Sequence, residues 1–330
     1  MTTESRPLVS IVVPVFNEEL NIGPFYEAVS HVIEPLSPLY DFEFVFTDNH
    51  STDATFPLLR ELAQRDSRVR AYRFSRNFGY QRSIMTGYGR AVGDAAIQLD
   101  VDLQDPPELM ARFIAEWRSG ADVVYGIRVK REESWIINIQ RVLFYRLIDR
   151  LSEEKIPVDA GDFRLISRRV IDLLKNFEDA QPYLRGTIAT LGFEQVGIPY
   201  SRNARVRGES KFPFSKLVSL ALDGILNHST VPLRISTYFG LAVSAVTLLS
   251  IVGYTIGKLL LGSQWPAGFA TLAALILASI SINAMLLGII GEYLGRMYRQ
   301  LKKRPLTIIE EVAGISPESP LSPTPTMQSS

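Results

Sequence analysis

The segment Ala95–Pro107 reads AAIQLDVDLQDPP, and it indicates how this part of the chain folds. Its apolar start is typical of a strand buried in a sheet, and the two prolines at its end prevent the strand from continuing. Because residues i and i+2 of a strand lie on one face, Asp100 and Asp102 can point the same way. Two carboxylates held so close repel each other unless a cation lies between them. The pair is therefore either a site for Mg²⁺ or Mn²⁺ or an acidic loop that faces water, and on its own it does not decide between them.

Strands and helices alternate on both sides of this segment. Apolar, often β-branched runs predict strands, and they lie at residues 8–16, 42–47, 69–74 and 122–126. Helical segments are expected between them, to about residue 33, over 55–64, to about residue 91 and over 107–118. This alternation predicts an α/β fold with a doubly wound, parallel sheet, in which ligands bind outside the carboxyl ends of the strands. We therefore expect one site, built from the polar residues that follow the strands: Asn17, Glu18, Asp48, Asn77, Asp100 and Asp102.

The next part of the chain is less regular. Residues 132–151 have the pattern of an amphipathic helix, and the segment 159–164 interrupts it. Short helices are expected from there to about residue 191, followed by a strand over 193–200.

Composition and missing motifs exclude several classes of site. The chain has no cysteine and three histidines, which excludes disulfides and thiolate metal sites and disfavours a histidine-rich one. A net charge of +0 gives no sign of nucleic-acid binding. The turn after the first strand carries no G-x-G-x-x-G, and the chain has no G-x-x-x-x-G-K-[ST] phosphate loop. Acidic strand ends instead suit a nucleotide whose phosphates are bridged by a metal ion.

The last third of the chain has the composition of a membrane segment. Residues 235–257 and 264–291 carry no charged side chain, and each run is long enough to cross a hydrocarbon core of roughly 30 Å. Basic residues precede the first run and follow the second, so the positive-inside rule predicts that both ends lie in the cytosol. The polar first seven residues have no signal-peptide pattern, which agrees with a cytosolic start. We therefore expect a multi-pass membrane protein with both termini in the cytosol.

These patterns predict four regions along the chain. Residues 1–210 are expected to form a cytosolic catalytic domain, and 211–230 an amphipathic helix in the membrane interface. Residues 231–304 are expected to form a transmembrane hairpin with spans at about 235–257 and 266–291. Residues 305–330 are expected to form a cytosolic tail that is partly disordered, because its end is rich in Ser and Pro. G-x-x-x-G pairs in both spans permit close helix contacts and hence a homo-oligomer.

Several motifs together resemble glycosyltransferase family 2, which has the GT-A fold. They are VPVFNEE at 13–19, DNHSTD at 48–53, NFG at 77–79 and DVDLQDPPE at 100–108. Two further motifs, GDFRL at 161–165 and R-x-x-G-x-S-K at 205–211, make the chain most similar to the polyprenyl-phosphate branch of the family. That branch includes dolichol-phosphate mannose synthases and bacterial bactoprenol glucosyltransferases.

The resemblance implies roles for individual residues. It implies a nucleoside pocket and diphosphate site lined by Pro14, Phe16, Glu18, Asp48 and Asp100. It implies that the metal, Mg²⁺ or Mn²⁺, is held by Asp100, Asp102 and Gln104. The catalytic residues that it implies are Asp102, Asp162, Arg128 and Arg131, with both arginines near the donor phosphates. One departure is Asn49, where the family usually has a second Asp, and this weakens the assignment of the base contact.

A lipid phosphate is expected to enter near the basic loop that precedes the interfacial helix. The residues expected to bind it are Arg202, Arg205, Ser210 and Lys211. The alternative is that these cations attract anionic lipid headgroups in general, at about 1 kcal/mol each. Asp162 has several alternative roles: it orients Arg164, binds the sugar, touches the metal, or forms a structural salt bridge within Gly-Asp-Phe-Arg. Glu18 and Asp48 are either ligands or residues beside a helix N-terminus.

The reaction expected from the resemblance is transfer of a sugar from a nucleotide-sugar to polyprenyl phosphate. A lipid phosphate is already anionic at neutral pH, so its oxygen needs no general base. Metal-assisted, inverting single displacement would then give a β-linked lipid-phosphate sugar from an α-linked donor. UDP-glucose is the expected donor, with GDP-mannose and UDP-N-acetylhexosamines as alternatives. A membrane-anchored nucleotidyltransferase and a non-catalytic scaffold or transporter component also remain open.

Overall fold

The computed structural model describes residues 6–128, 160–177, 182–202, 269–302 and 304–314, with scattered residues between 233 and 256. The chain divides into two compact units. The first comprises Met1–Ser134, Ile156–Ser210 and Arg304–Ser330, and the second comprises Trp135–Lys155 and Lys211–Lys303. We describe each unit by itself.

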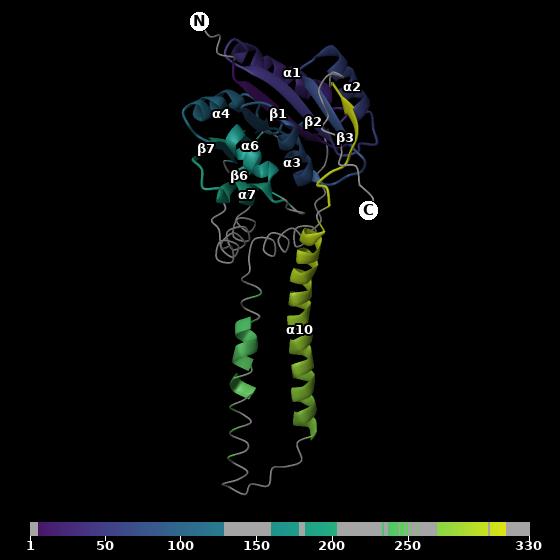
Figure 1. Ribbon diagram of the computed structural model, residues 1–330, viewed down its shortest axis with the longest axis vertical. Helices are drawn as coiled ribbons and strands as arrows, with labels where there is room; N and C mark the ends of the chain where they lie inside the picture. Colours follow the sequence, from purple (N-terminus) through teal and green to yellow (C-terminus); the bar gives the residue numbers. More distant parts are fainter. Residues whose placement is uncertain are drawn as a thin grey trace, which may run out of the picture. The chain divides into compact units, whose positions relative to one another are not determined.

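The first unit is built around a single mixed sheet of eight strands (Figure 1). The strands are β1 (Leu8–Val15), β2 (Asp41–Asp48), β3 (Val69–Phe74), β4 (Ala95–Gln98), β5 (Val123–Arg128), β6 (Ala160–Ser167), β7 (Gln195–Tyr200) and β8 (Ile309–Ala313). Their order across the sheet is β7-β5-β6-β4-β1-β2-β3-β8. Strands β1 to β4 are parallel to one another, as are β5 and β7, while β6 and β8 run antiparallel to their neighbours. The prediction of a mostly parallel α/β sheet is confirmed.

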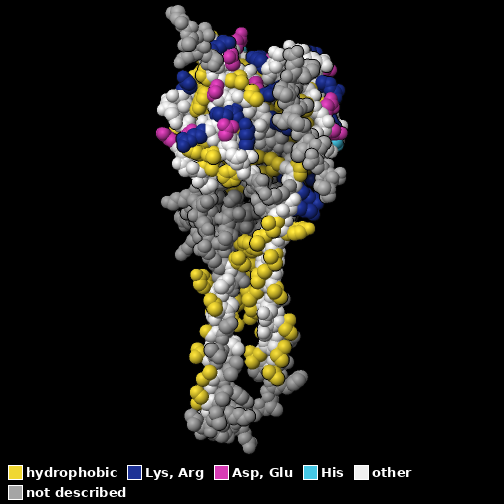
Figure 2. Space-filling model, in the orientation of Figure 1, with side chains coloured by type: hydrophobic (Ala, Val, Ile, Leu, Met, Phe, Trp, Pro, Cys, Tyr) yellow, Lys and Arg dark blue, Asp and Glu magenta, His cyan; other side chains and the backbone are white. Residues whose placement is uncertain are grey.

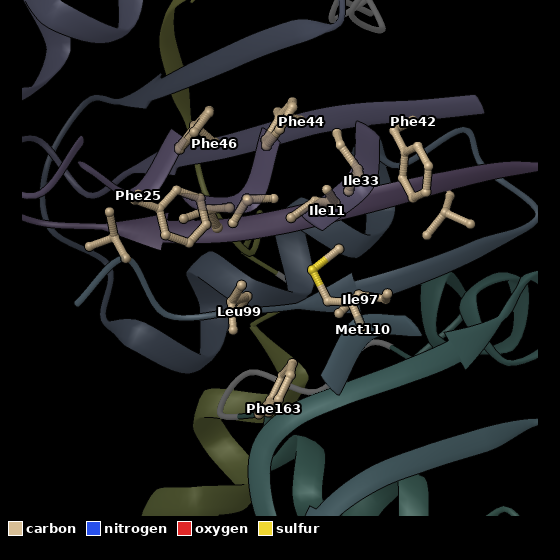
Figure 3. Close-up of a cluster of buried hydrophobic side chains, with 14 of the residues drawn as sticks. Ile11, Phe25, Ile33, Phe42, Phe44, Phe46, Ile97, Leu99, Met110 and Phe163 are labelled. Carbon is tan, nitrogen blue, oxygen red and sulfur yellow. The ribbon is translucent and has the colours of Figure 1, made fainter. Parts of the chain in front are cut away.

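Helices cover both faces of this sheet, which explains why its central strands are mostly apolar and almost completely buried. One face packs against α1 (Ile22–Ile33), α2 (Thr55–Arg65) and α4 (Leu109–Arg118), and the other against α3 (Tyr80–Arg90), α6 (Arg168–Lys175) and α7 (Leu184–Thr190). Alternate residues of β1 separate accordingly, because Ile11 and Val13 face the first layer and Val12 faces the second. Figure 3 shows part of the first layer, where the ring of Phe25 on α1 meets that of Phe46 on β2 edge to face, with 6.1 Å between the ring centroids. A short 3₁₀ helix, η1 (Glu34–Leu36), follows α1.

Strand β6 covers residues that we expected to form an interruption at 159–164 and the start of a run of short helices, so the strand was not predicted. The strand lies between β4 and β5 and runs antiparallel to both. Its sequence AGDFRLIS hides the strand pattern, because the charged residue Arg164 is buried at 4% exposure. Arg164 donates a hydrogen bond to the carbonyl oxygen of Gly161 at 2.9 Å, which satisfies part of its guanidinium inside the unit. The reversed direction has a consequence for function, since it brings the beginning of β6 to the edge where the parallel strands end.

Strand β8 was not predicted, because residues 305–330 were assigned to a tail. It pairs with β3 and forms one edge of the sheet. Two further bonds fasten the preceding residues: Ser75 N–H donates to the Ile308 carbonyl at 2.9 Å, and the hydroxyls of Thr86 and Thr307 lie 2.9 Å apart. The chain that leaves the second unit therefore returns to the sheet of the first.

The described part of the second unit is dominated by α10 (Phe269–Leu301), a helix of 33 residues. Its window Ala278–Gly295 is long and apolar enough to cross a membrane, judged by length and composition. Hydrophobic side chains lie exposed along it (Figure 2). The predicted second span, 266–291, overlaps α10 from residue 269 onward. The first span, 235–257, falls largely outside the described residues, where only the shorter apolar helix Thr237–Thr247 is described, so two transmembrane helices are not confirmed.

Candidate active site

One edge of the sheet collects nearly all the residues that the sequence singled out. Strands β1, β2, β4, β5 and β7 end there, and the antiparallel β6 begins there. The segments at this edge are Phe16–Glu18, Asp48–Ser51, Asp100–Asp105, Arg128, Gly161–Asp162 and Arg202. The prediction that these strand ends form one site agrees with this topology. Arg131, Arg205, Ser210 and Lys211 lie outside the described residues.

Hydrogen bonds join the loops after β1 and β2. The backbone N–H of Asn17 donates to Ser51 Oγ at 2.9 Å, and that of Glu18 donates to Thr55 Oγ1 at 2.8 Å. In return, Asn17 Oδ1 accepts a bond from the N–H of Thr52 at 2.8 Å. The two loops therefore form one rigid pair, which we call the nucleoside end of the site.

Asp48 lies at the centre of the nucleoside end. It is completely buried, and its Oδ1 accepts bonds from the N–H and hydroxyl of Ser51 at 3.0 and 2.5 Å. Its Oδ2 has no hydrogen-bond partner among the described residues, although Arg73 Nη1 lies 3.9 Å away. Burial raises the pKa of Asp48, and the bonds to Ser51 offset part of this rise. A buried acceptor oxygen without a donor is costly, so a ligand N–H would stabilise it.

The other predicted members of this end differ in exposure. Pro14 is buried within β1, whereas Phe16, directly after the strand, is 44% exposed and offers a ring to a ligand. Glu18 is half-buried, and its Oε2 accepts a bond from Asn21 Nδ2 at 2.5 Å. Asn21 immediately precedes α1, so part of the role of Glu18 is to support the start of that helix.

Among the described residues, three other than glycine adopt the left-handed backbone conformation, and all follow strands at this edge. Their φ angles are 55° at Asn17, 64° at His50 and 54° at Leu103. Asn and His tolerate this conformation, but for leucine it is unfavourable. At Leu103 it turns the chain so that the N–H of Gln104 donates to Asp102 Oδ1 at 3.2 Å. Backbone strain that is retained at one edge indicates a functional site.

Asp100 is fixed by two neutral groups that the sequence analysis missed. Its Oδ1 accepts bonds from the hydroxyl of Tyr80 at 2.6 Å and from Gln98 Nε2 at 2.9 Å. Gln98 was detectable, because it precedes Asp100 by two residues and so shares its face of the strand. Tyr80 begins α3 and had no signal in the sequence.

Acidic neighbours surround Asp100. Its pKa is raised to about 6: burial raises it most, the Tyr80 hydrogen bond lowers it, and the charges of Asp105, Asp102 and Asp162 raise it further. Such crowding is relieved by a cation. Among the described residues no group of three or more Asp, Glu, His or Cys is arranged to hold a metal. A site of two carboxylates nevertheless fits Mg²⁺, which takes its remaining ligands from water and substrate phosphates.

Gln98 and Gln104 add unsatisfied groups beside the two carboxylates. Gln98 Oε1 and Gln104 Nε2 are buried and have no hydrogen-bond partner in the part of the chain that the structure describes. One is an acceptor and the other a donor, so a hydrated ion or a phosphate would satisfy them. The donor set at Asp100, Asp102 and Gln104 therefore fits the predicted metal and diphosphate.

Asp162 belongs to the same cluster, and its partner is a residue that we did not predict. The β4–β6 register pairs Gln98, two residues before Asp100, with Arg164, two residues after Asp162, and the charge of Asp162 acts on Asp100. Arg185 of α7 binds both oxygens of Asp162, at 2.8 and 2.6 Å. Burial alone would raise the pKa of Asp162, but the bonds and charge of Arg185 hold it below its usual value. The alternative of a salt bridge within Gly-Asp-Phe-Arg is not what the structure has, because the partner comes from α7.

Asp105 brings together two arginines that the sequence analysis had assigned to different ligands. It is 1% exposed, and its Oδ1 accepts bonds from Tyr200 OH at 2.5 Å and from Arg202 Nε at 3.2 Å. Its Oδ2 lies 3.5 Å from Arg128 Nη2, and Arg128 Nε also donates to Tyr200 OH at 3.2 Å. Burial and the bond to Asp105 raise the pKa of Tyr200, so the phenol stays neutral and donates. Neither Asp105 nor Tyr200 was predicted as a site residue.

Comparison with known proteins gives results of three kinds. The model for "Glycosyl transferase family 2" matches residues 10–174. The uncharacterized glycosyltransferase YkcC of Bacillus subtilis (strain 168) is 39% identical over 93% of this chain and 94% of its own length. The prophage bactoprenol glucosyl transferase homolog of Escherichia coli (strain K12) is 38% identical over 92% of this chain and 99% of its own. Among solved structures, a mannosyltransferase from Pyrobaculum calidifontis in complex with GDP-Man and Mn²⁺ has a TM-score of 0.49 at 18% identity, covering 88% of each chain.

Proposed function

This chain belongs to glycosyltransferase family 2 and is a glycosyltransferase with a GT-A-like α/β fold, and from that premise we propose that it transfers a sugar from a nucleotide-sugar to a polyprenyl phosphate. One observation carries the proposal. A carboxylate pair suited to a donor diphosphate and a guanidinium pair suited to an acceptor phosphate lie on one sheet edge, where Asp105 stands near both. We further propose glucose as the sugar, which the name of the Escherichia coli relative supports, and UDP as its carrier.

The donor is proposed to lie across the ends of β2, β1 and β4. The unsatisfied Oδ2 of Asp48 would accept a bond from the base, and the exposed ring of Phe16 would pack against the nucleoside. Asp100 and Asp102, with Gln104, would hold Mg²⁺ or Mn²⁺, and the ion, when bound, would neutralise charge on the leaving diphosphate. Tyr80 and Gln98 would keep Asp100 in place before the donor arrives.

The acceptor is proposed to bind through its phosphate, and its chemistry is simple. A phosphate oxygen attacks the anomeric carbon and forms the new C–O bond. The bond between that carbon and the donor's β-phosphate oxygen breaks, and its electron pair leaves with the nucleoside diphosphate. No proton moves, because the phosphate is already anionic, so the residues of this chain have only to align the reactants and balance their charge. One displacement inverts the anomeric configuration.

A membrane location fits this acceptor. The apolar window of α10 supports an anchor in a bacterial-type cytoplasmic membrane, with the catalytic unit and both termini in the cytosol. Membrane lipids would then surround the second unit, and a homo-oligomer would be formed by contacts of its helices.

A transfer assay tests the proposal directly. Purified protein is incubated with Mg²⁺, polyprenyl phosphate and radiolabelled UDP-glucose, GDP-mannose or UDP-N-acetylglucosamine, and the lipid is extracted into organic solvent. We expect label in the lipid phase with UDP-glucose, and none with Asp102→Ala. Label in the lipid phase with another donor instead would show that the proposed sugar is wrong and would identify the sugar that is transferred. Absence of label with every donor would contradict the transferase proposal and favour a nucleotidyltransferase or a scaffold.

A further inference from the structure

Asp105, Arg128 and Arg202 form an ion-pair cluster in which the carboxylate is buried and the two guanidinium groups are more exposed. Its carboxylate is 1% exposed, whereas the side chains of Arg128 and Arg202 are 33% and 32% exposed. Each oxygen of Asp105 holds one arginine, Oδ2 facing Arg128 and Oδ1 facing Arg202. The acid is therefore inside and the two cations partly face solvent.

The backbone on both sides of Asp105 is restricted. Leu103 precedes it in the left-handed conformation, and two prolines follow it. A residue before proline is confined to extended conformations, and each proline ring fixes its own φ. Helix α4 then begins at Leu109, with Met110 N–H bonded to the Pro107 carbonyl at 2.9 Å. A carboxylate on such a turn can hold other groups at fixed positions.

The arginines are prepared for an anion. Two guanidinium groups repel each other, and Asp105 cancels one of the two charges, so one positive charge remains for a ligand. The described contacts use two nitrogens of Arg128 and one of Arg202, and a guanidinium has five N–H donors. Planar guanidinium donors match the oxygens of a phosphate.

The strand order indicates which phosphate binds here. Neighbouring strands of a sheet are about 4.8 Å apart. Strand β4 is two strands away from β2, a distance of about 10 Å, and β7 is three strands beyond β4, a further distance of about 14 Å. The arginines therefore lie beyond Asp100 when viewed from the nucleoside end. A donor with its base at Asp48 and its diphosphate at Asp100 already fills the first interval, so the acceptor fills the second.

We infer that Asp105 is a positioning residue that holds the guanidinium groups of Arg128 and Arg202 as a two-armed receptor for the acceptor's phosphate. This inference rests on the proposed function. It assigns Arg128 to the phosphate of the acceptor, whereas the sequence analysis assigned it to the phosphates of the donor. Tyr200 completes the support, because its hydroxyl contacts both Asp105 and Arg128.

Direct binding tests the inference without relying on sugar transfer. Full-length protein in detergent is titrated with a polyprenyl phosphate, with the matching polyprenol, and with UDP. We expect Asp105→Asn to weaken polyprenyl phosphate binding about tenfold, because one charge-assisted contact to each arginine is lost. Tyr200→Phe should weaken it about threefold, since only a neutral hydroxyl is removed. Binding of UDP and of polyprenol should change less than about twofold in both variants.

Asp122→Asn is the matched control, because Asp122 binds Ser167 Oγ at 2.8 Å and lies near Arg169 at the opposite end of β6. It should leave all binding constants and the KM values unchanged. In transfer assays Asp105→Asn should raise the KM for polyprenyl phosphate more than it lowers kcat, a separation that general loss of structure would not give.

If Asp105→Asn weakened UDP binding and left polyprenyl phosphate binding unchanged, the inference would be overturned, and Arg128 and Arg202 would be assigned to the donor phosphates. Unchanged binding of both ligands would overturn it as well. Should Asp105→Asn fail to fold, Tyr200→Phe decides by the same criteria. Should the wild type transfer no sugar, phosphate-dependent lipid binding that Asp105→Asn loses still supports the receptor, and lipid binding without phosphate dependence contradicts it.

Discussion

The two ends of the catalytic edge treat their carboxylates differently. At the nucleoside end, Asp48 accepts hydrogen bonds from Ser51 and Glu18 accepts one from Asn21, while Arg73 lies 3.9 Å from Asp48, beyond hydrogen-bond distance. At the other end, which we call the phosphate end, Asp162 and Asp105 are bound by arginines. The nucleoside end offers acceptor oxygens, and the phosphate end offers cations held in place by buried acids.

The difference follows from the ligands that each end has to bind. A nucleoside presents N–H and O–H groups, so a carboxylate that keeps a lone pair available suits it. Phosphates present negative charge, and arginines that face them need acids behind them to limit mutual repulsion. Asp100 combines features of both ends, because its hydrogen-bond donors Tyr80 and Gln98 are neutral while its acidic neighbours raise its pKa.

The largest effect is expected at this boundary. Asp100→Asn should lower kcat about 100- to 1000-fold, because an amide can still accept the Tyr80 bond but cannot balance a cation. The melting temperature should change little, which separates this variant from one that unfolds. Transfer rates are measured over a range of Mg²⁺ and Mn²⁺ concentrations, with Asp172→Asn on the exposed surface of α6 as control. A kcat close to that of the wild type at saturating metal would remove Asp100 from the metal site.

A large loss of stability is expected within the phosphate end. Arg185→Gln leaves the charge of Asp162 buried without its partner, and we expect the free energy of unfolding to fall by about 3 kcal/mol. The double variant Asp162→Asn/Arg185→Gln should regain part of this loss, because no uncompensated charge remains. The coupling between the two side chains is measured by denaturant unfolding of the wild type, Asp162→Asn, Arg185→Gln and the double variant. Additive effects would show that the pair is not coupled and would break the distinction between the two ends.

Sequence reasoning found the nucleoside end well and the phosphate end poorly, for a physical reason. Leu8–Val15 and Asp41–Asp48 are mostly apolar strands with polar residues at or directly after their carboxyl ends, so pattern alone placed Asn17, Glu18 and Asp48 at one edge. Asp100 and Asp102 were found in the same way. Such strands are buried on both faces, so apolar residues on both faces indicate the strand.

At the phosphate end the decisive contacts join residues that are far apart in the chain. Asp162 lies in a strand with a buried arginine, and its partner Arg185 is 23 positions later in a helix. Asp105 and Tyr200 are 95 positions apart. Periodicity reports local structure only, so neither pairing was visible before the antiparallel position of β6 was known.

At the nucleoside end, Asp48→Asn should affect binding and stability in opposite directions. We expect the KM for the donor to rise about tenfold, because the unpaired oxygen is replaced by an amide. The pKa of Asp48 is raised on folding, so its contribution to stability is full below the unfolded value of 3.8 and is lost as pH rises through the folded value. The asparagine variant should therefore be more stable than the wild type at pH 7. At pH 4 this difference in stability should be smaller, because Asp48 of the wild type is then largely protonated. Melting curves at both pH values check this, and a destabilised variant at pH 7 would contradict it.

The smallest effects are expected where β8 meets the nucleoside end. Glu310 Oε2 lies 3.4 Å from His50 and 3.7 Å from Arg73, while Glu311 pairs with Arg60. These side chains are about half exposed, so Glu310→Gln and Glu311→Gln should each lower the free energy of unfolding by less than about 1 kcal/mol, and less still at high salt.

The two variants should nevertheless differ in catalysis. Arg73 donates to the Ser51 carbonyl at 3.1 Å and lies near Asp48, so Glu310 contacts the loop that holds the buried acid. Glu310→Gln should raise the donor KM about twofold, a change of a few tenths of a kcal/mol, and Glu311→Gln should not. Measuring the donor KM of Glu310→Gln and Glu311→Gln in parallel shows whether Glu310 affects donor binding, because both variants remove one negative charge from the same strand. Equal KM values would mean that β8 only closes the edge of the sheet, and unequal ones that the last strand of the chain adjusts the end where the donor binds.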